Sequence, residues 1–302
     1  MIAVVTGGGS GIGRELVRQL AAQGCSVAAC DLNADTISAT VSLAQAGAPP
    51  GCRVTGHVCD VADEAQVLRF RDEVLEQHAT RHVNLVFSNA GIGGAGSFVV
   101  DSRQEWERTF AIDFWGVYYC ARAFLPLLIA SSEGVLVNTS SVNGFWASLG
   151  PGIPHTAYST AKFAVKGFSE ALIEDLRINA PHVRVAVVMP GHIGTDIVTN
   201  SRRILGVPGV EQMSDEEVEA GRASMTRFGA VAEGASVEEL RQAMARAGDA
   251  FRDTAPMSAA EAAETILDEV RKGSWRILVG EDAKGLDAVV RAKPEAAYDF
   301  LA

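Results

Sequence analysis

The chain has few cysteines and no cysteine pattern that would build a metal site or a disulfide framework. Its five cysteines, in 302 residues, show no CxxC and no Cys/His ligand spacing. Three of them lie in or beside apolar segments with strand character, so we expect buried, reduced thiols. The same lack of ligand spacing predicts no metal site.

Basic charge is also scarce. Lysine and arginine number 26 against 37 aspartates and glutamates, which gives a net charge of −11. The basic residues are scattered, with no run that would follow a nucleic-acid backbone. This charge balance argues against nucleic-acid partners and against anionic membrane surfaces. We find no segment typical of a membrane span or a signal peptide, and therefore expect a cytoplasmic protein.

What the chain does have is a regular alternation of short apolar segments with helical ones. Hydrophobic residues make up 48% and charged residues 21%, the composition of a globular protein with a sizeable core. Strands buried on both faces and alternating with helices indicate an α/β, Rossmann-type fold: a doubly wound parallel sheet with helices on both faces. About seven strands are expected, at 2–7, 26–31, 53–60, 83–91, 134–141, 184–191 and 275–280.

The alternation stops between residues 195 and 258. This stretch has helical patches and no strand pattern. A connection of that length inside a compact domain is usually functional. We therefore expect one domain over residues 1–302, with 195–258 inserted as a helical lid over the substrate.

A glycine-rich segment, TGGGSGIG, follows the first strand and opens the first helix. Glycines at Gly7, Gly11 and Gly13 let the backbone turn sharply and approach a diphosphate, which then lies at the helix N-terminus. The glycine spacing alone is weak, and its placement between strand and helix is what gives it weight. The segment predicts a dinucleotide site.

An acidic residue, Asp31, ends the second strand 18 residues after Gly13. There it can accept hydrogen bonds from both hydroxyls of an adenosine ribose, and it would repel a 2′-phosphate. No arginine or lysine stands at Leu32, Asn33 or Ser10 to offset that repulsion. The pattern favours NAD(H) over NADP(H). The alternative is that Asp31 only caps the next helix.

Tyr158 and Lys162 lie four residues apart, on one face of a predicted helix. A phenol beside an ammonium can exchange protons near neutral pH. One ammonium ~4 Å away, through an effective dielectric of ~20, supplies roughly 4 kcal/mol, enough to lower the pKa of the phenol by ~3 units. We therefore expect Lys162 to lower the pKa of Tyr158. The alternative is an exposed tyrosine beside a solvated lysine.

Taken together, several motifs resemble the short-chain dehydrogenase/reductase family. They are TGGGSGIG, Cys59-Asp60-Val61, Ser88-Asn89-Ala90-Gly91, Ser141, the Tyr158/Lys162 pair and Pro190-Gly191. The resemblance runs in the family's order from Ile2 to about Thr195 and continues weakly to the end of the chain.

The resemblance implies an NAD(H)-dependent oxidoreductase that interconverts a secondary alcohol and a ketone. Tyr158 would be the acid/base, Lys162 would bind the nicotinamide ribose, and Ser141 would bond the reacting oxygen. The residues implied to contact the cofactor are Gly7, Gly9, Ser10, Gly11, Ile12, Gly13, Asp31, Leu32, Asp60, Val61, Asn89, Ala90, Gly91, Tyr158, Lys162, Pro190, Gly191, Ile193 and Thr195. An NADPH-dependent ketoreductase and a non-catalytic NAD-binding protein are the alternatives.

Two departures from the family pattern leave roles open. Asp113 stands where the family usually has an asparagine that helps to hold a proton-relay water, so Asp113 is either a relay residue or structural. The spacing of 17 residues between Ser141 and Tyr158 is longer than usual, so we expect residues 143–157 to form a loop over the substrate. Ser140 is a rival to Ser141.

Other side chains are ambiguous in the sequence. His155 either adds acid/base chemistry or is an exposed residue at the start of a helix, and substrate contact by His192 is open. Six apolar residues predict either an apolar substrate pocket or packing within the lid: Phe145, Trp146, Ile153, Met213, Met225 and Phe228. The resemblance also implies a small-molecule substrate and a homodimer or homotetramer.

Overall fold

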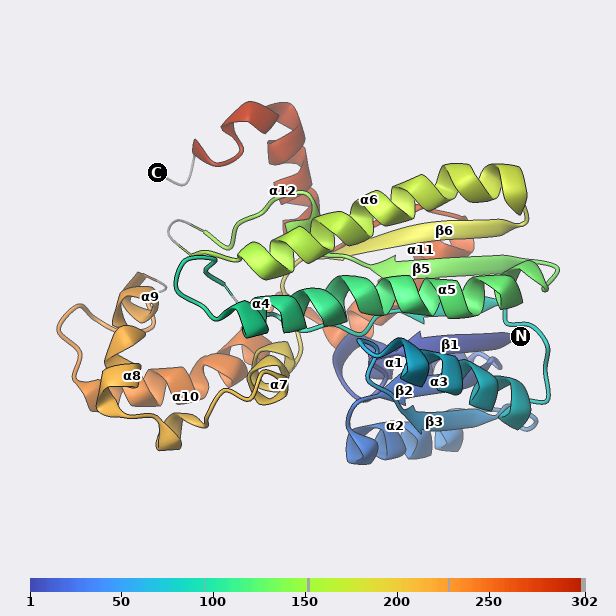
Figure 1. The fold of residues 1–302 in the computed structure, drawn as a ribbon, viewed down its shortest axis with the longest axis horizontal. Helices are drawn as coiled ribbons and strands as arrows, with labels where there is room; N and C mark the ends of the chain where they lie inside the picture. Colours follow the sequence, from blue (N-terminus) through green and yellow to red (C-terminus); the bar gives the residue numbers. More distant parts are fainter. Residues whose placement is uncertain (95, 151–152, 228, 300–302) are drawn as a thin grey trace.

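A parallel sheet of seven strands forms the centre of the molecule (Figure 1). The computed structural model describes residues 1–94, 96–150, 153–227 and 229–299. The strand order is β3-β2-β1-β4-β5-β6-β9, and every neighbouring pair is parallel. The strands are β1 (Ile2–Thr6), β2 (Ser26–Asp31), β3 (Val54–Val58), β4 (Leu85–Ser88), β5 (Gly134–Thr139), β6 (Val183–Pro190) and β9 (Arg276–Val279). The predicted seven-stranded, doubly wound sheet is confirmed.

Helices cover both faces of this sheet because alternate strand residues point to opposite sides. The covering helices are α1 (Gly11–Ala22), α2 (Ala34–Gly47), α3 (Glu64–Gln77), α5 (Gly116–Ile129), α6 (Thr156–Asn179) and α11 (Ala259–Lys272). Ala3 and Val5 belong to a core with α1, α2 and α11, whereas Val4 belongs to a second core with α3, α5 and α6. Because the strands carry apolar residues on both faces, the sheet separates two cores.

The long apolar segment over 103–130 forms a helix that is interrupted. It consists of α4 (Arg103–Phe110), a π-helical turn at Ala111–Trp115 and α5. A π-turn inserts an extra residue and rotates the next part of the helix, and such turns are frequent at functional sites. This one carries Asp113.

We expected no segment typical of a membrane span, and by length and composition alone the same segment is an exception. Arg103–Ile129 is long and apolar enough to cross a membrane by length and composition alone. Half of its most apolar stretch is buried inside the fold, where Phe124 and Leu128 pack in the core beside the sheet. A core helix passes the same length-and-composition test.

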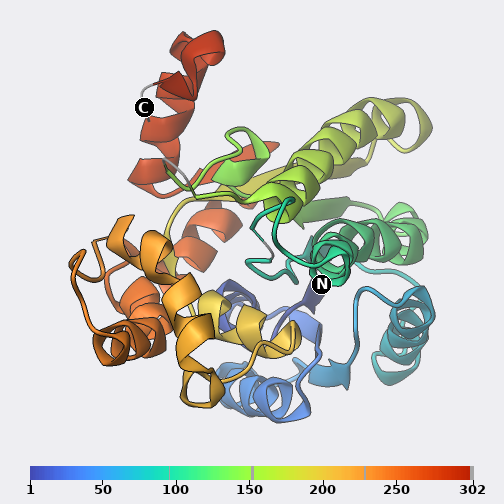
Figure 2. The same cartoon turned by 60° about the vertical axis from the view of Figure 1, so that its left-hand side comes forward.

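Residues 195–258 form a group of helices at the carboxyl ends of the strands (Figures 1 and 2). They are α7 (Ile197–Ile204), α8 (Asp215–Ala220), α9 (Arg222–Arg227) and α10 (Val237–Asp253). At the base of the group, β7 (Ile193–Gly194) pairs with β8 (Met257–Ser258), a two-residue strand that the sequence pattern did not indicate. The helical character of the segment matches the expectation.

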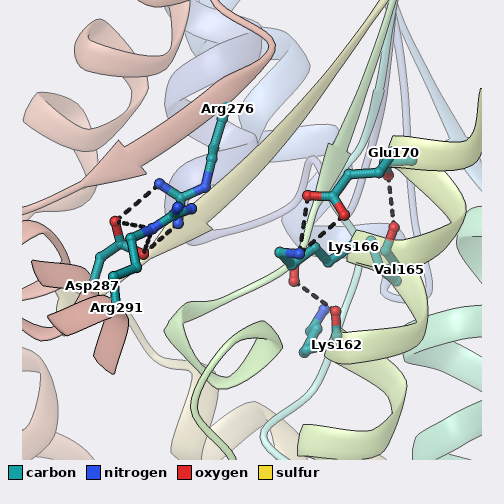
Figure 3. Close-up of polar contacts among 9 residues, drawn as sticks. Lys162, Val165, Lys166, Glu170, Arg276, Asp287 and Arg291 are labelled. Atoms are coloured by element: carbon teal, nitrogen blue, oxygen red, sulfur yellow. Dashed lines mark hydrogen bonds and ion pairs between the residues drawn. The ribbon is translucent and has the colours of Figure 1, made fainter. Parts of the chain in front are cut away.

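An ion-pair cluster fastens the C-terminal part of the chain to the sheet. Arg276 of β9 and Arg291 of α12 (Glu281–Ala292) both bind the carboxylate of Asp287 (Figure 3). At the start of the same helix, Asp282 accepts a hydrogen bond from the His192 N–H at 2.7 Å. Helix α12 is thereby held beside the carboxyl end of β6.

Candidate active site

One cavity of about 1220 Å³ lies at the carboxyl ends of the strands, bounded by the glycine-rich loop, the Tyr158 helix and the helices of residues 195–258. Parallel α/β sheets bind ligands at this edge. Of the residues implied by the family resemblance, all but Gly9 and Asp113 line the cavity. Gly9 donates its N–H to Asp31 Oδ2 at 2.9 Å, and Asp113 is buried behind Gly91.

The glycine-rich loop forms a cradle that side chains would fill. Gly7 and Gly11 have φ of +65° and +53°, a region that other residues rarely adopt. A Cβ on Gly13 would collide with the Gly7 carbonyl and lie 2.7 Å from Asn89 Nδ2. Glycine at this position therefore allows the helix to pack closely against the loop, and residues 10–14, the first turn of α1, line the cavity, where an anion can approach their N–H groups.

The carboxylate of Asp31 is oriented by the backbone. It accepts the Gly9 N–H at Oδ2 and the Asn33 N–H, at 3.0 Å, at Oδ1. The cap of α2 is Asn33, which corrects the alternative that Asp31 only caps that helix. Arg14, which the sequence reasoning missed, also lines the cavity and donates to the Gly9 carbonyl.

Two further residues at this end of the cavity were not found from the sequence. Arg108 of α4 pairs with Asp60 at 2.7 Å, 48 residues away along the chain. Thr6 Oγ1 accepts the backbone N–H groups of Asn89 and Ala90, which joins β1 to the loop after β4. Arg108 belongs to no motif, whereas Thr6 is the first residue of the TGGGSGIG segment, which is the signal by which it could have been found.

Tyr158, Ser141 and Lys162 converge at the other end of the cavity. Tyr158 and Ser141 hydrogen-bond, and Lys162 Nζ lies 5.3 Å from the centre of the Tyr158 ring. Lys162 is 3% exposed and donates to the Thr139 carbonyl at 3.2 Å. The alternative of an exposed tyrosine beside a solvated lysine is wrong.

The two candidate serines differ in their hydrogen-bond partners. The Ser140 hydroxyl donates to the Lys162 carbonyl at 2.7 Å, so it helps to hold α6. Ser141 Oγ accepts the Asn143 N–H at 3.1 Å, which leaves its own proton free to point toward the phenol. Of the two, Ser141 is the one that contacts Tyr158.

We expected the pKa of Tyr158 to be lowered, and in the structure it is raised. Burial raises it, the neighbouring Asp113 carboxylate raises it further, and the hydrogen bond with Ser141 lowers it. The Asp113 carboxylate, whose Oδ1 lies 3.8 Å from Lys162 Nζ, acts on the phenol in the direction opposite to an ammonium. The expectation considered only the ammonium and left out the desolvation of the phenol.

Asp113 is fully buried and only partly satisfied. Oδ1 accepts the Ile92 N–H at 2.8 Å, and Oδ2 has no hydrogen-bond partner within the described residues. Burial raises the pKa of Asp113 from 3.8 to about 6, although Lys162 and the Ile92 N–H act in the opposite direction. Asp113 is therefore a carboxyl group that titrates close to neutral pH, next to the lysine.

The remaining sequence expectations divide between the cavity wall and other positions. Residues 143–150 and 153–157 run along the cavity, where Trp146, Leu149 and His155 line it. Met225 of α9 also lines it, whereas Phe145, Ile153 and Met213 do not. Phe228 lies outside the described residues.

The two histidines near the cavity differ in their bonding. His192 Nε2 bonds the Phe251 carbonyl at 2.7 Å, which ties the loop after β6 to α10. The His155 ring lies 4.6 Å from the Tyr158 ring, centre to centre. His155 lies at the start of α6 as expected but is only partly exposed, so the alternative of a fully solvent-exposed residue is wrong.

Known proteins resemble this chain over most of its length. Residues 1–205 match the family described as short chain dehydrogenase. A protein of Mycobacterium tuberculosis named as an oxidoreductase, SadH, is 36% identical over 290 residues, 96% of this chain and 90% of that protein. Meso-2,3-butanediol dehydrogenase of Serratia marcescens is 31% identical over 65% of this chain and 72% of its own.

Solved structures give the same result. A short-chain dehydrogenase/reductase of Burkholderia phymatum in complex with NAD superposes with a TM-score of 0.76 at 25% identity, covering 98% of this chain and 93% of the other. A metagenomic short-chain oxidoreductase in complex with NADP gives a TM-score of 0.56 at 29% identity, covering 63% and 82%. The family binds a nicotinamide cofactor, and the glycine cradle and oriented Asp31 fit one. This protein belongs to the short-chain dehydrogenase/reductase family and is an oxidoreductase of that family.

Proposed function

We propose that this protein is an NAD(H)-dependent oxidoreductase that interconverts a secondary alcohol and a ketone. The observation that carries the proposal is the meeting of Ser141, Tyr158 and Lys162 in the cavity that also contains the glycine-rich loop and Asp31. A proton donor, a hydrogen-bond partner for the reacting oxygen and a dinucleotide cradle are the parts that such a hydride transfer requires.

The cofactor would lie along the cavity from the strand ends of β2 and β3 to the Tyr158 helix. Asp31 would bond the adenosine ribose, Asp60 and Val61 would hold the adenine, and the loop from Gly7 to Gly13 would hold the diphosphate. Thr195 and Ile193 would contact the nicotinamide half, together with Lys162. NAD⁺ bound there supplies the acceptor for the hydride of the carbinol carbon.

The side chains would then move one proton. In oxidation Tyr158, as phenolate, takes the proton of the substrate hydroxyl while Ser141 holds the same oxygen. In reduction the neutral phenol returns a proton to the carbonyl oxygen. The raised pKa of Tyr158 favours the protonated form, which is the donor in ketone reduction.

Asp113 is proposed as the next group in the proton path. Its Oδ2 is buried and unpartnered in the described structure, and its Oδ1 lies 3.8 Å from Lys162 Nζ. A carboxyl group with a pKa of about 6 can hold a proton below that pH and release it above. A purely structural role, holding the Ile92 N–H, remains the alternative.

Helices α7 to α10 are proposed as a lid, in a single domain that spans the chain. Asn200 of α7 donates to Ser10 Oγ of the glycine-rich loop at 3.3 Å, and Ser201 Oγ accepts the Gly93 N–H at 2.7 Å. Apolar lid residues such as Met225 and Phe251 line the cavity. These contacts support a cover over cofactor and substrate.

Use of NADPH is a second candidate, and one observation favours it. Arg14 lies beside Gly9, whose N–H bonds Asp31, so a cation stands near the adenosine end of the cavity. Its guanidinium is already engaged by the Gly9 carbonyl and Thr40 Oγ1. The Asp31 carboxylate would bond the ribose hydroxyls and repel a 2′-phosphate, so we propose NAD(H) as the cofactor.

We also propose a cytoplasmic homodimer or homotetramer. Apolar side chains on α5 and α6 are open to solvent: Trp115, at the start of α5, is 41% exposed, and Ile129 and Phe163 are each 42% exposed. Light scattering at micromolar concentration measures the assembly, and a monomer would contradict this part of the proposal.

The activity is tested with a panel of secondary alcohols and NAD⁺, following the absorbance of the reduced nicotinamide. We expect turnover by the natural protein and a loss of at least 1000-fold with Tyr158→Phe, because the phenylalanine cannot exchange a proton. NADH binding by the variant, measured by fluorescence, should be retained. Equal turnover by both proteins, or NADH binding with no turnover of any alcohol or ketone, would favour the non-catalytic alternative.

A further inference from the structure

His155 is the residue immediately before α6, and it lies against the proposed acid/base. Its ring centre is 4.6 Å from that of Tyr158, with 37° between the ring planes. His155 and Tyr158 both line the cavity. Any substrate whose reacting oxygen reaches Tyr158 therefore brings its neighbouring atoms next to His155.

The imidazole of His155 has no hydrogen-bond partner within the described residues. The other cavity histidine, His192, is engaged by the Phe251 carbonyl at 2.7 Å. Burial lowers the pKa of His155 to about 4, so the ring is neutral at working pH. A neutral imidazole carries one N–H donor and one nitrogen acceptor. Neither ring nitrogen is among the fully buried, unpartnered atoms of the described residues, so the ring is accessible from the cavity it lines, and a bound molecule can pair with it there.

The part of the cavity wall around the His155 imidazole is largely apolar. Trp146 and Leu149 from the loop before α6 line the same cavity, as do Met225 and Phe251 from the lid segment and Leu286 from α12. Pockets of this kind use a few polar groups on an apolar wall to orient a ligand. The apolar wall can pack against a hydrocarbon part of the substrate, and His155 can hydrogen-bond one polar atom near the reacting carbon.

We infer that His155 hydrogen-bonds a second polar atom of the substrate, so that the substrate is a secondary alcohol or ketone with another oxygen one or two carbons away and an apolar remainder. The inference rests on the proposed function. His155 is a specificity-determining residue here, and the proton transfer remains with Tyr158.

Three probes of one chain length test it: hexan-2-ol, hexane-2,3-diol and hexane-2,4-diol. The natural protein is compared with His155→Phe, which keeps an aromatic ring against Tyr158 and loses both nitrogens. The ratio of kcat/KM for the better diol to that for hexan-2-ol should fall about tenfold, mainly through KM, because one hydrogen bond is lost. His155→Gln, which can still donate and accept, should restore most of that ratio.

NADH binding by fluorescence checks that each variant is folded, and His155→Leu replaces H155F if the latter fails this check. An unchanged ratio in both variants, or a ratio that Gln fails to restore, would overturn the inference and leave the proposed function standing. Failure of the natural protein to oxidise any of the three probes while other secondary alcohols of the panel are oxidised would overturn the inference alone, and failure with the whole panel and the matching ketones would overturn both.

Discussion

Lys162 Nζ lies 3.8 Å from Asp113 Oδ1 inside the fold, with 3% of the lysine and none of the aspartate exposed. The chain places a carboxylate where the family usually has an amide, so a charge stands behind the proposed acid/base. Gly91 leaves the space for both groups, since a Cβ there would lie 2.9 Å from Asp113 Oδ1 and 3.1 Å from Lys162 Nζ. The pH dependence of both activity and stability should therefore change when this pair is altered.

Asp113→Asn should move the pH profile of alcohol oxidation to lower pH. The ionised carboxylate raises the pKa of Tyr158, so its removal lets the phenolate form at lower pH. The alkaline rise of log kcat/KM is expected to shift down by about one pH unit, the effect of one charge through a dielectric near 20. A profile that keeps its position would show that Asp113 does not act on Tyr158.

The same substitution should stabilise the protein above pH 6. The pKa of Asp113 rises from 3.8 to about 6 on folding, so the folded state binds more protons between these values. Stability is then lost as the pH rises through that window, by on the order of 3 kcal/mol. Asparagine keeps an acceptor for the Ile92 N–H without the buried charge. We expect Tm to rise by several degrees at pH 8 and by much less at pH 4.

Tm measured at the two pH values distinguishes this explanation from a change in packing. A gain of the same size at pH 4 and pH 8 would mean that charge is not responsible. A loss at pH 8 would mean that the pair of Lys162 and Asp113 stabilises the fold.

Asp31→Ala should change the choice of cofactor. The natural protein should bind NADH more tightly than NADPH, because the carboxylate bonds the ribose hydroxyls and repels a 2′-phosphate. In the variant the ratio of the two Kd values should fall by about 100-fold. Asp35→Ala, four residues further on in the exposed first turn of α2, is the matched control and should leave the ratio unchanged. Tighter binding of NADPH by the natural protein would refute the cofactor assignment.

Asp287→Asn should loosen α12 from the sheet. Asp287 is 12% exposed at the side chain and binds both Arg276 and Arg291, which hold its pKa down against burial (Figure 3). Its contribution is present above the ordinary carboxyl pKa and is lost as the pH falls through the lowered one. We expect a loss of about 2 kcal/mol at pH 7, which is ~4 °C in Tm.

Glu281→Gln provides the control for this helix. Glu281 pairs with Lys284, and their side chains are 88% and 56% exposed, so no measurable change in Tm is expected. Equal effects of the two substitutions would contradict a special role for the Asp287 cluster.

Much of this fold was readable because strand and helix signals are local. The expected strand at 26–31 has those bounds in the structure, and the strand at 275–280 is present as β9. Glycine loop, Asp31 and Tyr158 were found because parallel strands bring their carboxyl ends to one edge, whatever their order. The π-turn at Ala111–Trp115 was not foreseen, since it adds one residue to a helix without changing its apolar pattern.

The sequence by itself determined the alternation of elements, the family and the residue types at the strand ends, because each is written in short-range spacing. The tertiary structure alone decided which charges meet. Arg108 reaches Asp60 across 48 residues, and Asp113 reaches Lys162 across 49 residues. It also reversed the expected direction for the pKa of Tyr158, because burial and a neighbouring carboxylate depend on what the fold packs around a side chain and on nothing in the local spacing.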